Sequence, residues 1–230
     1  FDTMGQMSRK RTVFLNTLFQ LLGKGVTGLV SFAISILLAS TLGLSGYGDY
    51  TKITTFVAFF WLLSDFGLYA LYVKIDTSDT NSSFGSLLFL RILISAILIT
   101  AASCIAFILP SSGTDGYPWF IKTGIILYSV TILFQSLTTS ANALFQKKLR
   151  YDLSVWASVS GSIVSLLGLL FVSMMVSSSQ NVLHSLLIMI TGIAITSSVS
   201  LYLAKTRIRF SLGHDNKIMK ELFFLSLPVG

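Results

Sequence analysis

Long apolar stretches, separated by short polar segments, run through almost the whole chain of 230 residues. A helix needs about 20 apolar residues to cross the hydrocarbon core of a bilayer, which is about 30 Å thick. Six stretches are long enough, and they are Thr12–Thr41, Thr51–Val73, Ser86–Leu109, Pro118–Phe145, Leu153–Val176 and Val182–Ala204. Their lengths suit helices, whereas a β-barrel would show alternating segments of about ten residues. The pattern predicts an all-α integral membrane protein, folded as a six-helix transmembrane bundle.

The polar segments divide the chain into four parts. We expect residues 1–11 to be a cytoplasmic N-terminus, 12–204 to be the bundle and 205–220 to be a cytoplasmic linker. Residues 221–230 open another apolar run, which is too short to cross a bilayer. We therefore expect them to begin a truncated seventh span of a longer polypeptide.

The composition supports a membrane protein, because 53% of the residues are hydrophobic and 11% are charged. A soluble domain carries about a quarter charged residues. The net charge of +7 could suggest nucleic acid, but the basic residues lie in alternate connections. Such a bias marks the cytoplasmic side of a membrane protein. We therefore expect a multi-pass protein of the plasma (inner) membrane, with both ends of the bundle inside and no nucleic-acid partner.

The connections on the opposite side are short. Gly43–Asp49 is rich in glycine, and Pro110–Pro118 carries proline, glycine and serine. Both read as outer loops. Tyr117 and Trp119 stand where an interfacial aromatic belt belongs.

Lys24 interrupts the first apolar stretch, about 18 Å beyond the basic cluster Arg9–Arg11 at helical rise. A cation at that depth costs several kcal/mol unless it meets a polar partner or a wet cavity. Asp65 lies about 14 Å from the cytoplasmic end of the second span. We expect the two charges to be at similar depth, where they could pair. The pair could fasten two helices, or Lys24 could meet an anionic ligand while Asp65 couples transport to a cation.

Further polar groups lie in the third and fourth spans. Arg91 stands near a span end, where it could snorkel to the headgroups or bind a phosphate. In the fourth span a helical face carries amides and hydroxyls at Gln135, Thr138, Thr139, Asn142 and Gln146. The face suits a sugar ligand as well as helix–helix hydrogen bonds. The candidate substrate-binding residues are thus Lys24, Arg91, Gln135, Asn142 and Gln146.

Small residues recur in the fifth span at Ala157, Gly161 and Ser165, and a similar run in the sixth contains Gly192. We expect close helix packing there. The single cysteine, Cys104, and two histidines without a second residue at metal or triad spacing give no metal or catalytic constellation, and there is no phosphate-binding glycine loop. The sequence therefore predicts no catalytic residue, no metal and no cofactor, and a protein that is not an enzyme.

Several short strings share a resemblance. They are Asn16–Leu42 with its Gly23–Gly25 (GKG), Leu42–Tyr50 (LGLSGYGDY), Ser64–Leu68 (SDFGL), Ala143–Tyr151 (ALFQKKLRY) and Leu225–Pro228 (LSLP). Together they resemble the N-terminal half of polysaccharide biosynthesis proteins. These are the O-antigen and lipid-linked oligosaccharide flippases of the multidrug/oligosaccharidyl-lipid/polysaccharide exporter superfamily, which serve cell-envelope glycans such as lipopolysaccharide.

The resemblance implies two six-helix bundles around a central cavity, of which this chain would be the first. The implied partners are a polyprenyl-diphosphate-linked glycan, membrane lipids and the C-terminal bundle of the same polypeptide. The implied transport is alternating access around a site near the midplane. A cation-coupled drug antiporter of the same superfamily, a membrane-embedded transferase of cell-surface glycans, and a membrane scaffold without a ligand are the alternatives.

Overall fold

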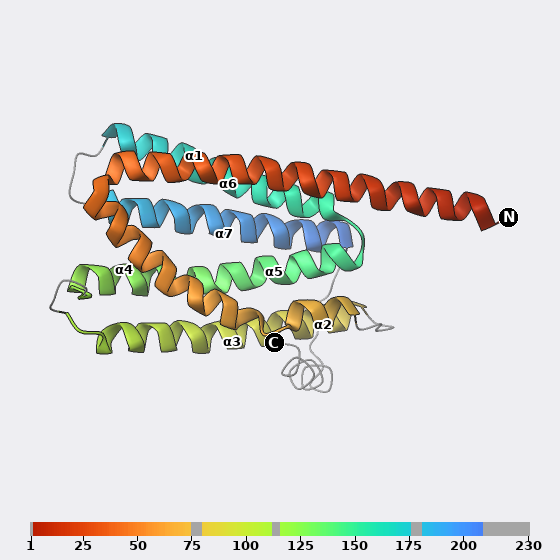
Figure 1. Cartoon of the computed structure of the whole chain (residues 1–230). Helices are drawn as coiled ribbons and strands as arrows, with labels where there is room; N and C mark the ends of the chain where they lie inside the picture. Colours follow the sequence, from red (N-terminus) through yellow and green to blue (C-terminus); the bar gives the residue numbers. More distant parts are fainter. Residues whose placement is uncertain (1, 75–79, 112–115, 176–180, 209–230) are drawn as a thin grey trace.

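The structure is a computed structural model, and it describes residues 2–74, 80–111, 116–175 and 181–208. Every regular element within these ranges is an α-helix, which confirms the predicted all-α bundle (Figure 1). The helices are α1 (Asp2–Asp65), α2 (Leu68–Lys74), α3 (Thr80–Ile108), α4 (Trp119–Ser129), α5 (Thr131–Lys147), α6 (Tyr151–Met175) and α7 (Asn181–Ile208). Five helical stretches among the described residues are long and apolar enough to cross a membrane.

The predicted spans fall on these stretches. The third, fifth and sixth spans are α3, α6 and α7, while α4 and α5 together form the fourth. The first and second spans lie in one stretch, Gln20–Lys74. The helix of the first span extends back to Asp2, into the segment expected to precede the bundle. The expected linker is helical to Ile208. Residues 209–230, including the expected seventh span, lie outside the described residues.

A bend at Gly43 joins the first two spans, where the sequence predicted a loop over Gly43–Asp49. The prediction was wrong, because residues 44–50 are helical and only Gly43 leaves helical geometry, at φ 67° and ψ −177°. Glycine alone adopts that conformation readily. One residue therefore reverses the chain, and α1 consists of two arms: a first arm before Gly43 and a second arm after it (Figure 1).

The second span is also broken, which the sequence did not predict. Phe66 and Gly67 have positive φ values of 38° and 73°, so the helix stops at Asp65 and restarts at Leu68. The Oδ1 atom of Asp65 accepts a hydrogen bond from the backbone N–H of Tyr69 at 3.3 Å. A side-chain acceptor of this kind satisfies a free N–H in the first turn of a helix. The break places an acidic side chain where backbone groups lack helical partners.

Close contact between α6 and α7 rests on two glycines. A Cβ atom on Gly161 would lie 2.5 Å from the carbonyl oxygen of Gly192, and a Cβ on Gly192 would lie 3.0 Å from that of Gly161. Side chains at these positions would force the helices apart. The close packing predicted from the small residues of the fifth and sixth spans is confirmed.

Two lysines brace the end of the molecule that carries the Gly43 bend. Lys122 is buried, and its Nζ donates to the carbonyl oxygens of Phe107 at 3.1 Å and Leu109 at 2.6 Å, at the end of α3. A cation suits the C-terminal carbonyls of a helix. Lys52 donates to the carbonyl oxygen of Gly116 at 3.1 Å. These lysines are therefore held by the protein itself.

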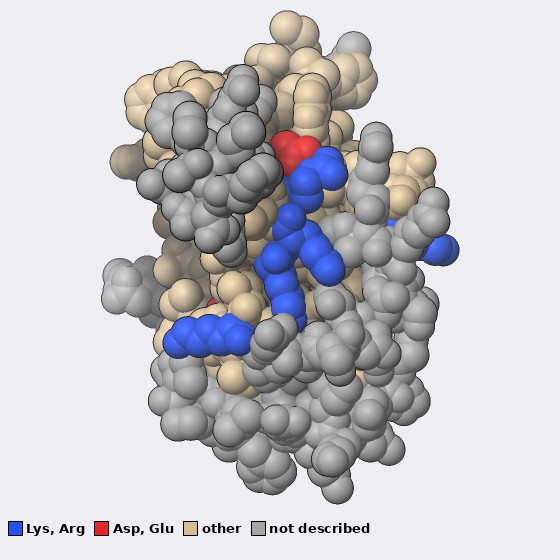
Figure 2. Space-filling model, turned by 90° about the vertical axis from the view of Figure 1, so that its right-hand side faces the viewer, with Lys and Arg blue, Asp and Glu red and all other residues tan. Residues whose placement is uncertain are grey.

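The opposite end of the molecule is basic. Figure 2 views this end and shows lysines and arginines in a band across it. The described basic residues at the ends of α2, α5 and α7 and between α5 and α6 are Lys74, Lys147, Lys148, Arg150 and Lys205. Arg150 makes two 2.9 Å hydrogen bonds to Asp152. The charge bias read from the sequence thus separates the two ends in three dimensions.

Candidate functional site

Helix α5 contributes residues to two clefts. Gln135 and Thr139 line the first cleft, and Asn142 lines the second. These positions are four and three residues apart, so they share one face of the helix. The first cleft is completed by the second arm of α1, and the second cleft by the first arm and by α6. One polar face of α5 therefore contributes to a cleft with each of the two arms.

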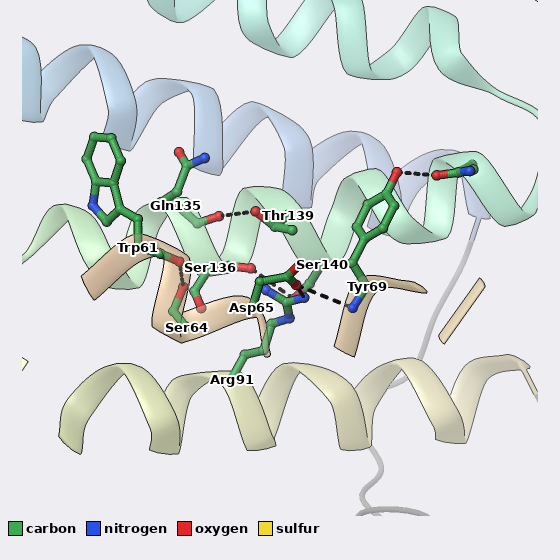
Figure 3. Close-up of polar contacts among 10 residues, drawn as sticks. Trp61, Ser64, Asp65, Tyr69, Arg91, Gln135, Ser136, Thr139 and Ser140 are labelled. Atoms are coloured by element: carbon green, nitrogen blue, oxygen red, sulfur yellow. Dashed lines mark hydrogen bonds and ion pairs between the residues drawn. The ribbon is translucent and has the colours of Figure 1, made fainter. Parts of the chain in front are cut away.

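The first cleft has a volume of about 830 Å³ and lies along the helix break at Phe66 and Gly67. Its walls are largely apolar and aromatic, and they include Trp61. The described polar residues that line it are few, namely Thr55, Ser64, Asp65, Gln135 and Thr139, and Figure 3 shows the last four. Ligand sites are commonly apolar clefts of this size with a few placed polar groups.

Asp65 pairs with Arg91 at the edge of this cleft. Arg91 Nη2 lies 2.5 Å from Asp65 Oδ1 (Figure 3). The Arg91 side chain is 0% exposed, while that of Asp65 is 43% exposed. The expected pairing of Asp65 with Lys24 is thus wrong. Arg91 on α3 reaches the carboxylate because the chain breaks directly after Asp65, which brings the end of the second arm toward α3.

Arg91 is also not the snorkelling side chain that the sequence suggested. It is fully buried, and its Nε and Nη1 atoms have no hydrogen-bond partner among the described residues. A buried guanidinium that has lost its only carboxylate would cost several kcal/mol. Because the Arg91 side chain has no exposed surface, it cannot contact a ligand phosphate in this conformation. Arg91 affects the cleft through its ion pair with Asp65.

The second cleft is lined by Lys24 and has a volume of about 220 Å³. Its polar lining includes Gln20, Asn142, Tyr151 and Ser154. Ser154 donates to the Oδ1 atom of Asn142 at 2.8 Å. Within the described part of the chain, no carboxylate oxygen lies within 4.0 Å of the Lys24 ammonium, which belongs to an exposed residue. The cleft therefore offers one uncompensated positive charge among neutral hydrogen-bonding groups.

The predicted polar face of the fourth span is divided by the structure. Gln135 and Asn142 line the two clefts. Gln146 does not: its Oε1 atom accepts a hydrogen bond from the hydroxyl of Tyr69, so it joins α5 to α2. Thr138 is buried, and its hydroxyl donates to the carbonyl oxygen of Phe134 at 2.9 Å. The face thus serves both helix packing and the clefts.

Sequence reasoning missed several residues that line the clefts, among them Trp61, Tyr151 and Ser154. Trp61 in the first cleft is one aromatic residue among many in an apolar run, and nothing in the sequence marks it. Tyr151 and Ser154 join the Lys24 cleft from α6. They were not assigned to a site, although Tyr151 directly follows the basic segment and could have drawn attention to this end of α6.

Two comparisons with known proteins match the chain. A family model described as "Polysaccharide biosynthesis protein" matches residues 13–230. A solved structure is similar over 95% of this chain and 51% of its own, with a TM-score of 0.64 and 13% sequence identity. Its title reads "Reverse polarity of binding pocket suggests different function of a MOP superfamily transporter from Pyrococcus furiosus". A search of curated proteins found no match.

The solved structure shows the fold. The chain spans about half the length of that transporter, so it has the fold of about half of a transporter of the multidrug/oligosaccharidyl-lipid/polysaccharide exporter superfamily. The family match covers nearly the whole chain. Together with the five apolar helical stretches, it shows that this multi-pass membrane protein belongs to the polysaccharide biosynthesis protein family.

Proposed function

We propose that this chain forms part of a transporter that moves a lipid-linked oligosaccharide or polysaccharide precursor across the plasma membrane. The family match and the transporter fold support export. The observation that carries the finer proposal is Lys24, a cation within an apolar stretch that lines a polar cleft and lacks a carboxylate within 4.0 Å in the described part. Such a residue is a functional candidate by default.

The chemistry of the substrate matches this site. A polyprenyl diphosphate carries negative charge, which an ammonium in a region of low dielectric attracts strongly. Asn142, Ser154 and Tyr151 beside Lys24 supply neutral hydrogen-bonding groups to phosphate oxygens. The polyprenyl tail needs only apolar surroundings, and the chain exposes many large apolar side chains on its helices. No covalent step is required.

Transport in this proposal is alternating access. The chain would contribute one bundle, with its basic end in the cytoplasm, and a second bundle of the same polypeptide would close the site. Rocking of the bundles about Lys24 would expose the diphosphate first to one side and then to the other.

The test replaces Lys24 in the full-length protein of the source cells. We expect Lys24→Ala to abolish surface glycan and to leave membrane insertion intact, because the diphosphate loses its cation. Lys24→Arg should retain part of the export, since the charge remains. The control is Lys148→Ala, which removes an exposed lysine at the basic end of the molecule. Normal surface glycan in Lys24→Ala cells, measured beside total protein in the membrane, would remove Lys24 from the mechanism.

A further inference from the structure

We infer that the cleft between the second arm of α1 and α5 binds the sugars next to the diphosphate of the transported lipid. This inference rests on the proposed function and divides its site in two. Lys24 would hold the phosphates, and a separate sugar subsite, formed by Trp61, Ser64, Asp65, Gln135 and Thr139, would hold the glycan.

The free hydrogen-bonding capacity of the subsite suits hydroxyl groups. The Thr139 hydroxyl donates to the carbonyl oxygen of Gln135 at 2.9 Å, and the Ser64 hydroxyl donates to that of Trp61 at 2.8 Å. Both hydroxyl oxygens keep acceptor capacity. The Gln135 amide has no hydrogen-bond partner within the described ranges, so it offers a donor and an acceptor. Sugar hydroxyls can serve both.

Asp65 adds a strong acceptor that is fixed in place. Both of its contacts, from Arg91 Nη2 and from the N–H of Tyr69, use Oδ1. The side chain is 43% exposed beside the cleft. Hydrogen bonds to a carboxylate are about twice as strong as those between neutral groups. Arg91 is a positioning residue here, since it holds the carboxylate in place through Oδ1.

Other occupants fit this cleft less well. A phosphate would meet the carboxylate of Asp65, which repels it. A metal cation would find a single carboxylate among the described residues of the lining, Asp65, which is already paired with the buried guanidinium of Arg91 at 2.5 Å. The polyprenyl tail would leave the polar groups without partners, which is costly in a region without water. A sugar satisfies these groups with its hydroxyls and can pack its apolar face on an aromatic ring such as Trp61.

The two subsites lie within reach of one molecule. Thr139 and Asn142 are three residues apart on α5, which corresponds to about 5 Å along the helix axis. The volumes of the two clefts also differ: the cleft at Lys24 has about 220 Å³ and the cleft beside Asp65 has about 830 Å³. The smaller cleft thus fits a charged group and the larger one fits sugars.

The experiment compares two lipids on the purified full-length protein in nanodiscs. One is polyprenyl diphosphate, and the other is the lipid-linked glycan that accumulates in source cells lacking this gene. We expect Gln135→Leu and Thr139→Val each to weaken binding of the glycan lipid about three- to tenfold, as loss of one hydrogen bond does. Binding of the sugar-free lipid should not change. Lys24→Gln should weaken both.

The matched control is Thr138→Val, because the neighbouring hydroxyl makes the same type of backbone hydrogen bond but lies outside the cleft lining. It should leave both affinities unchanged. Cleft variants that bind the glycan lipid normally, or that lose both lipids equally, would overturn the sugar subsite while the flippase proposal stands. A wild-type protein that binds neither lipid would overturn the flippase proposal and the subsite with it.

Discussion

At the scale of single residues, Asp65 and Arg91 show how burial sets the role of a charge. Arg91 is fully enclosed and two of its nitrogen atoms lack partners among the described residues, whereas Asp65 keeps 43% of its side chain exposed. The arginine therefore depends on the carboxylate more than the carboxylate depends on the arginine. Lys24 differs from both, since no carboxylate oxygen in the described part of the chain lies within 4.0 Å of its ammonium group.

This asymmetry predicts unequal losses of stability. Asp65→Ala leaves a buried, unpaired guanidinium, and we expect a cost of about 3–5 kcal/mol. Arg91→Met keeps the apolar stem and leaves only a half-exposed carboxylate, so its cost should be smaller. The midpoint of thermal unfolding in detergent measures both.

The double variant Asp65→Ala/Arg91→Met is the control, because it removes both charges and should be more stable than Asp65→Ala alone. An Arg91→Met variant that is less stable than Asp65→Ala would contradict the view that burial of Arg91 dominates.

At the scale of helices, glycines determine where the chain bends and where helices touch. Gly43 reverses the chain and Gly67 helps to break the second span, because both adopt positive φ values. Gly161 and Gly192 act differently, since their lack of a side chain lets α6 and α7 approach. The first cleft lies along one of these breaks.

We predict that Gly161→Ala destabilises the bundle by about 1–3 kcal/mol, as overpacking of a tight contact does. The added Cβ would lie 1.8 Å from Thr196 Oγ1 and 2.5 Å from a backbone oxygen. Gly48→Ala is the matched control, because nothing lies within 4 Å of its added Cβ. Thermal unfolding of the two variants gives the comparison, and equal midpoints would show that the α6–α7 contact can relax.

At the scale of the whole molecule, the two ends differ in how their lysines are used. Lys52 and Lys122 bind backbone carbonyl oxygens at one end. At the other end, basic residues at the ends of helices form a band (Figure 2). Most of them are exposed, and Lys147 is the partly buried member, whose Nζ donates to the carbonyl oxygen of Tyr72 at 3.5 Å. Basic residues collect on the cytoplasmic side of membrane proteins, so this difference predicts the orientation of the bundle.

Cysteine labelling tests the orientation. In a Cys104→Ser background, a cysteine replacing Lys148 should react with a membrane-impermeant reagent only in inverted vesicles. A cysteine replacing Ser111, an exposed residue near the other end, should react in intact cells. The reverse pattern would invert the proposed topology. Both variants should first be shown to reach the membrane in normal amounts.

The sequence by itself determined that this protein lies in a membrane and that its elements are helices. Apolar stretches of helical length leave few alternatives to a helical bundle, because a bilayer core satisfies no backbone hydrogen bond. The small residues around Gly161 also indicated close packing, because their four-residue spacing puts them on one face of the helix and can be read directly from the sequence. Lys24, Gln135 and Asn142 stood out because polar groups are rare in such stretches.

Only the tertiary structure decided which polar groups meet. Depth along a helix is readable from sequence, but rotation and the partner helix are set by packing, and so Asp65 could be placed near Lys24 in depth yet pairs with Arg91. The same holds for Gln146, which binds Tyr69 and not a cleft. Backbone breaks at Gly43 and Phe66 redirect the two arms of α1, and that redirection creates the clefts from residues far apart in the chain.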